Sequence, residues 1–108
     1  MKFKTICTCG ALFPIIVSSV AWAAGIVTVD QRGLAFSVAT LSVNKGDVVT
    51  FNNNDSTSHN IIVTGQGVRL NSGLQAPGVA FKAPFFKAGI YEVICGIHPR
   101  MKVAVTVR

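Results

Sequence analysis

Acidic residues are scarce in this sequence, and the basic residues do not cluster. Asp and Glu number 4 against 10 Lys and Arg, which gives a formal net charge of +6. The sequence has no run of Lys or Arg and no basic stripe with interleaved aromatic residues, so nucleic acid is not an expected partner. The scattered positive charge instead favours a protein partner with an acidic docking face.

The sequence also lacks an apolar run of the ~20 residues that a membrane-spanning helix needs. The apolar stretch 6–20 is interrupted by Cys, Pro and small polar residues. It follows the basic residues Lys2 and Lys4 and precedes Ala21-Trp22-Ala23, an order typical of a secretory signal peptide. We predict that residues 1–23 are a signal peptide, and that the mature chain is periplasmic or secreted, without a membrane span.

Cysteine is equally scarce. Of the three cysteines, Cys7 and Cys9 fall within the predicted signal peptide, which leaves Cys95 alone. One cysteine cannot form an internal disulfide. A free thiol is a liability in an oxidising compartment and metal ligation would protect it, whereas burial as a small core residue is the alternative.

Residues 24–108 show no amphipathic helical pattern, internal repeat or linker, and we expect them to form one domain. Short β-branched runs alternate there with turns rich in Gly, Asn and Asp, which predicts an all-β fold, an antiparallel β-sandwich. Residues 52–58 are wholly polar and predict a loop, while the Gly-rich segment 64–84 has the weakest pattern. The expected strands lie at 26–29, 41–43, 48–51, 59–63, 79–82, 90–95 and 102–107.

Four side chains have the chemistry of a soft metal site. Cys95, His98 and Met101 follow one another at three-residue intervals, and His59 lies far upstream. Two His, one Cys and a weak axial Met form the ligand set of a blue copper site. Zinc, which prefers a tetrahedral site without a thioether, is one alternative. A fold without metal is the other, in which His59 is a satisfied polar residue and Met101 belongs to the core.

Strand alternation predicts where these side chains meet. Successive side chains of a strand point to opposite faces, so His59 shares a face with Ile61, and Cys95 shares a face with Val93. If Ile61 and Val93 are core residues, both donor side chains point inward at strand ends. A metal ion would then be held between two loops at one end of the sandwich.

Several segments together resemble the small cupredoxins, and among these the amicyanin and plastocyanin group. The segments are Asp47-Val48-Val49-Thr50-Phe51, Ser58-His59-Asn60, Gly89-Ile90-Tyr91-Glu92 and the ligand loop from Cys95 to Lys102. The resemblance covers roughly Val27 to Val107, and the short spacing from His98 to Met101, beginning with Pro99, resembles the ligand loop of amicyanin. It implies a Greek-key β-sandwich that holds one type 1 copper ion cycling between Cu(I) and Cu(II).

The resemblance also implies the site residues. The equatorial copper ligands would be His59, Cys95 and His98, and the axial ligand would be Met101. The function implied is that of a soluble blue copper electron-transfer protein outside the cytoplasm, a monomer and not an enzyme. Its partner would be a cytochrome or another oxidoreductase.

The resemblance extends to the surroundings of the ligands. Asn60 matches a residue that braces the first ligand loop against the second. The chain departs from the family at Gly96, where Thr or Ser is frequent, so Asn60 could reach only the backbone at that position. Arg100 places a cation in the ligand loop.

His98 is the expected electron port, because its neighbours Ile97 and Pro99 are apolar and lie in a loop at the end of the sandwich. Two alternative functions remain at this stage: a periplasmic copper-binding protein for copper tolerance or delivery, and a metal-free interaction module. A carrier retains copper while it exchanges electrons, whereas a delivery protein releases copper to an acceptor. A module would not need Cys95.

Overall fold

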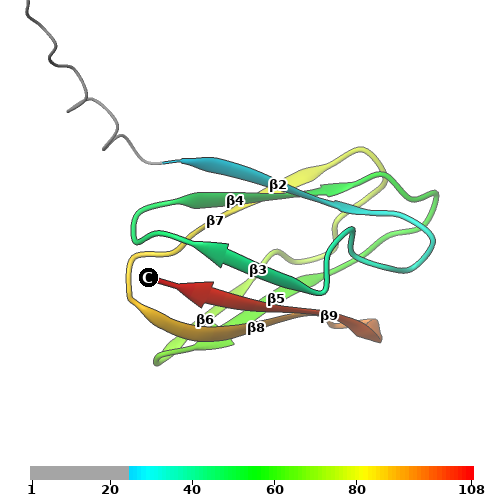
Figure 1. The fold of residues 1–108 in the computed structure, drawn as a ribbon. Coiled ribbons are helices and arrows are strands. Elements are labelled where there is room, and N and C mark those ends of the chain that lie inside the picture. Colours follow the sequence, from blue (N-terminus) through cyan, green and yellow to red (C-terminus); the bar gives the residue numbers. More distant parts are fainter. Residues whose placement is uncertain (1–24) are drawn as a thin grey trace, which may run out of the picture.

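Two β-sheets packed face to face form the protein in the computed structural model, which describes residues 25–108 (Figure 1). The predicted signal peptide lies outside the described residues. The three-stranded sheet has the order β2 (Ile26–Gln31), β4 (Val48–Asn53) and β7 (Ala80–Pro84). The five-stranded sheet has the order β3 (Thr40–Val43), β9 (His98–Val107), β8 (Gly89–Cys95), β5 (Ile61–Gly65) and β6 (Val68–Asn71). Residues 25–108 contain no helix that is long and apolar enough to cross a membrane.

The β-sandwich prediction is confirmed, and the structure adds two parallel strand pairs. Strand β2 pairs with β4, and β3 pairs with β9, in parallel. The pairs β4–β7, β5–β6, β5–β8 and β8–β9 are antiparallel, so both sheets are mixed. Side-chain alternation does not distinguish the two kinds of pairing, because the period is two in both.

The core lies between the sheets and follows from alternation along each strand. In β4, Val49 and Phe51 point inward, and in β8, Tyr91 and Val93 do so. Burial of such side chains is worth about 1.5–3 kcal/mol each, which orients every strand and with it the residues at the strand ends. The apolar inward pattern stops at one end of the three-stranded sheet, where the inward side chains of β2 and β4 are the amides of Gln31 and Asn53.

Several strand boundaries differ from the prediction, and one strand was missed. Strand β5 begins at Ile61 and not at His59, which forms an isolated bridge. Asn52 and Asn53 continue β4 rather than the polar loop, because the Asn53 amide is buried with hydrogen bonds to Thr57 O and Gln75 O. The segment 64–84, of which only 79–82 was expected to form a strand, also contains β6.

The predicted loop between the strands at 90–95 and 102–107 was also too long. Strand β9 begins at His98, which pairs with Cys95 across the turn at Gly96 and Ile97. The register shifts between Ile94 and Cys95, so the segment after His98 bulges at this end of the hairpin. The turn is therefore tight enough to bring the thiol and the imidazole together.

Candidate metal centre

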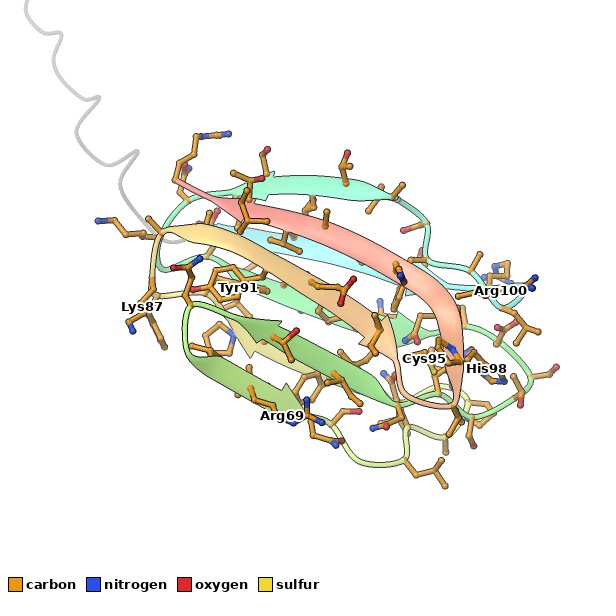
Figure 2. All side chains as sticks on the ribbon, turned by 90° about the horizontal axis from the view of Figure 1, so that it is seen from below. Arg69, Lys87, Tyr91, Cys95, His98 and Arg100 are labelled. Carbon is orange, nitrogen blue, oxygen red and sulfur yellow. The ribbon has the colours of Figure 1, made fainter. Side chains whose placement is uncertain are left out.

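The donor side chains come from three strand ends at one end of the sandwich. Cys95 is the last residue of β8, His98 is the first of β9, and His59 lies just before β5. Figure 2 shows Cys95 and His98 together at this end, with Lys87 at the opposite end. The side chains of His59 and Cys95 point inward, as strand alternation predicted. Both are fully buried, as are Ile61 and Val93.

Three donor atoms form a small triangle. His59 Nδ1 lies 3.2 Å from His98 Nδ1, and Cys95 Sγ lies 3.6 Å from each of these nitrogens. With metal bond lengths of about 2.0–2.1 Å to nitrogen and about 2.3 Å to sulfur, a trigonal site needs separations of roughly 3.5 Å and roughly 3.7 Å. The donor set is thus close to the size of a trigonal N₂S site, and the chemistry of its atoms suits copper.

Met101 lies on β9, three residues after His98. Its side chain is 3% exposed and shares the inward face of β9 with Val103 and Val105. It also lines a surface hollow together with His98 and Pro99. The structure therefore brings the thioether to the same end of the sandwich as the other three predicted donors.

The thiol and the turn after it are held by backbone bonds from Asn60. The Asn60 amide donates to Cys95 Sγ at 3.3 Å, and Asn60 O accepts from the Gly96 amide at 2.8 Å. The Asn60 side chain turns elsewhere and donates to Asn71 Oδ1 and Gly73 O. Its Oδ1 fills the space beside Gly96, where an added Cβ would meet it.

Asp55 fixes the ring of His59. Asp55 Oδ2 lies 2.8 Å from His59 Nε2, so the ring donates its Nε2–H and turns Nδ1 toward the other two donors. Hydrogen bonds from the Leu34 amide and the His59 ring lower the pKa of Asp55, and the Gly33 amide adds to them, while partial burial opposes the shift. The carboxylate is therefore an anionic acceptor at neutral pH.

Buried amides fix the backbone of His59. His59 and Gln75 exchange two backbone hydrogen bonds, of 2.9 and 2.7 Å. The Gln75 side chain donates to Phe51 O and Val79 O, and its Oε1 accepts from Gln31 at 2.9 Å. Since buried polar groups are costly unless paired, this network sets one position for the loop that faces His59.

Neither Asp55 nor the buried amides was singled out from the sequence. Asp55 stands four residues before His59 in a polar loop, which is a weak signal for a carboxylate on a candidate ligand. Gln75 lies in the segment with the weakest pattern, and its contacts to Gln31 and Phe51 join positions that are far apart in the sequence.

The candidate port residues surround the exposed side of the centre. His98 is half-buried, whereas Ile97 is 50% exposed and Pro99 is exposed. Leu34, which is 52% exposed and follows β2, lines the surface hollow that contains His98 and Pro99. Of the three clustered donors, His98 is therefore the one with an edge toward solvent, inside an apolar rim.

Comparison with known proteins points to the same chemistry. A family model described as copper-binding proteins of the plastocyanin/azurin family matches residues 23–108. The chain is 33% identical over 78 residues to chloroplastic plastocyanin from Tetradesmus obliquus, a match that covers 64% of this chain and 54% of that protein. It is 32% identical over 87 residues to amicyanin from Paracoccus denitrificans, covering 77% of this chain and 66% of the amicyanin. The chain thus spans between half and two thirds of these two relatives.

A solved structure shares the fold. The purple cupredoxin from Nitrosopumilus maritimus superposes with a TM-score of 0.67 at 28% sequence identity, over 76% of this chain and 99% of that one. The similarity therefore includes both sheets of a complete small cupredoxin.

Proposed function

Because the chain belongs to the plastocyanin/azurin family of copper-binding proteins, we propose that it is an electron carrier that holds one type 1 copper ion. The observation that carries the proposal is the triangle of His59, Cys95 and His98, with both histidines presenting Nδ1 to the same space. These three residues would hold the copper ion, and Met101 would supply a fourth, weaker donor. When bound, the copper ion supplies a one-electron Cu(I)/Cu(II) couple.

The protein's contribution is to keep the donors still. His59 and Cys95 are fully buried, and each is held by hydrogen bonds that do not involve the metal. A donor set that stays in place in both oxidation states limits rearrangement during electron exchange. The amide of Asn60 aimed at the Cys95 sulfur stabilises thiolate charge and so tunes the reduction potential.

Electrons enter and leave through the His98 edge. The apolar rim formed by Ile97, Pro99 and Leu34 lets a partner approach closely and excludes water. Arg100 is exposed beside this rim (Figure 2), so the partner, a cytochrome or another oxidoreductase, presents an acidic face. The protein acts as a monomer outside the cytoplasm, and it is a carrier rather than an enzyme.

The decisive experiment is the visible spectrum of the purified mature protein with Cu(II). We expect one equivalent of copper and an intense thiolate-to-Cu(II) band. Cys95→Ser is expected to lose the band and still fold, because Ser is close in size. A matched control is Ser42→Ala on the outer face of β3, which leaves all donors in place.

A colourless wild-type protein would contradict the type 1 site. A coloured protein that exchanges no electrons, but passes its copper to an acceptor, would contradict the carrier and support copper delivery or tolerance. Tight zinc binding with no Cu(II) band would indicate a zinc site instead.

A further inference from the structure

The Asp55 carboxylate joins two parts of the site that lie far apart in the sequence. Its Oδ2 lies 2.8 Å from His59 Nε2 and accepts from the Leu34 amide at 3.0 Å. Its Oδ1 accepts from the Gly33 amide at 2.7 Å. Asp55 is itself held by its own amide, which donates to Asn53 Oδ1 at 2.9 Å. One side chain thus touches the candidate ligand and the opposite loop at the same time.

The loop that Asp55 touches has an unusual backbone. Gly33 and Leu34 have φ values of 64° and 58°, so both are left-handed. For Leu34 this conformation is unfavourable, because it brings the Cβ close to the following carbonyl oxygen. Two successive amides turned toward one anion form a concave nest, and here the anion is the Asp55 carboxylate. The carboxylate therefore holds Leu34 in a conformation that the residue does not favour by itself.

Leu34 reaches the surface where a partner would dock. Its side chain is 52% exposed and lines the hollow shared with Ile97, His98 and Pro99. The same carboxylate therefore determines the ring orientation of His59 and the shape of the hollow beside His98.

We propose that Asp55 is a positioning residue that couples the metal centre to the docking surface, a role that rests on the proposed function. Through its contacts, the state of the His59 ring and the conformation of the Gly33–Leu34 loop change together. Removal of the carboxylate loosens the ligand and the docking loop at once.

The test compares Asp55→Asn with Asp30→Asn. Asp30 accepts from the Asn54 side chain and forms no hydrogen bond with the His59 ring, so this control removes the same charge from a neighbouring part of the molecule. For Asp55→Asn we expect Cu(II) affinity to fall about 10–100-fold. We also expect a more positive reduction potential, because the carboxylate that is removed stabilises Cu(II) relative to Cu(I). Amide hydrogen exchange at Gly33 and Leu34 should become faster. Asp30→Asn should stay close to wild type in all three.

Two results would overturn the coupling. Unchanged exchange at Gly33 and Leu34 would show that Asp55 does not hold the loop. Faster exchange with unchanged affinity and potential would show that it holds the loop alone. Hydrogen exchange is measured on the metal-free protein. Failure of wild type to bind copper would therefore contradict the proposed function, while the exchange rates would still test whether Asp55 holds the loop.

Should Asp55→Asn fail to fold, Asp55→Glu provides the same test. This variant keeps the charge but moves the carboxylate by one methylene. It is expected to change the loop exchange rates and the Cu(II) affinity together, and a change in only one of them would contradict the coupling.

Discussion

Gly96 shows how a single residue determines which contacts the ligand turn can make. A Cβ at this position would clash with Asn60 Oδ1 and would lie 2.9 Å from Ile62 Cδ1. The Asn60 side chain cannot simply move away, because its Nδ2 donates hydrogen bonds to Asn71 Oδ1 and Gly73 O. The turn is therefore tied to Asn60 through its backbone, with the Asn60 side chain filling the space of the missing Cβ.

Gly96→Ala should accordingly destabilise the protein by about 1–2 kcal/mol, the free energy of the two Asn60 side-chain hydrogen bonds that must break. Urea unfolding of the metal-free protein measures this change. In an Asn60→Ala background the clash with Asn60 is absent and only the contact with Ile62 remains, so the same substitution should cost less. Equal costs in the two backgrounds would show that Asn60 is not the obstacle.

At the scale of elements, one carboxylate secures the start of the fold. Asp47, in the turn between β3 and β4, accepts the amides of Gly25 at 2.8 Å and Asn44 at 2.8 Å. The Asn44 and Gly25 amides lower the pKa of Asp47 below its ordinary value of 3.8, with a small opposing effect of burial. The side chain therefore closes its own turn and ties it to the residue before β2.

This arrangement makes part of the stability depend on pH. A depressed carboxyl pKa gives stability that is complete above the unfolded value of 3.8 and is lost as the pH falls through the lower folded value. Asp47→Asn should be less stable than wild type at neutral pH, and the difference should shrink below about pH 4. Urea midpoints of both proteins across this range give the comparison. A constant difference at every pH would argue against the charge as the cause.

Strand alternation explains which parts of these elements could be predicted. The inward orientation of His59 and Cys95 is confirmed because Ile61 and Val93 set the face of each segment. The start of β9 at His98 was missed because the pattern of alternating Val residues begins only at Val103. Gln75 was missed for a different reason: its importance depends on contacts with distant residues, which leave no local pattern.

At the scale of the whole molecule, the charges around the hollow at His98 would determine how a redox partner docks. The hollow at His98 has an apolar lining with the cation of Arg100 at its edge. A carboxylate at Pro99 would repel an acidic partner and interrupt the apolar rim without touching Cys95 or His59.

Pro99→Asp should therefore slow electron exchange with an acidic physiological acceptor on the order of threefold to tenfold, with little change in the visible band. Ala88→Asp is the matched control, since Ala88 is exposed next to Lys87 at the opposite end of the sandwich (Figure 2). Stopped-flow rates should also fall as salt is added to wild type, because screening shortens the reach of the charges. Equal rates for the two variants would place the port elsewhere.

The position of β9 has a consequence for how the chain acquires its structure. This strand follows all the others along the chain, yet it lies between β3 and β8 and not at a sheet edge. Its parallel partner β3 is remote, since Thr40 pairs with Ala104. Pairings of such long range slow folding, and they cannot form before β9 has been synthesised. Cys95 and His98 lie on the hairpin of β8 and β9, which is the last to be synthesised. The donor set for copper is therefore complete only after the whole chain has folded.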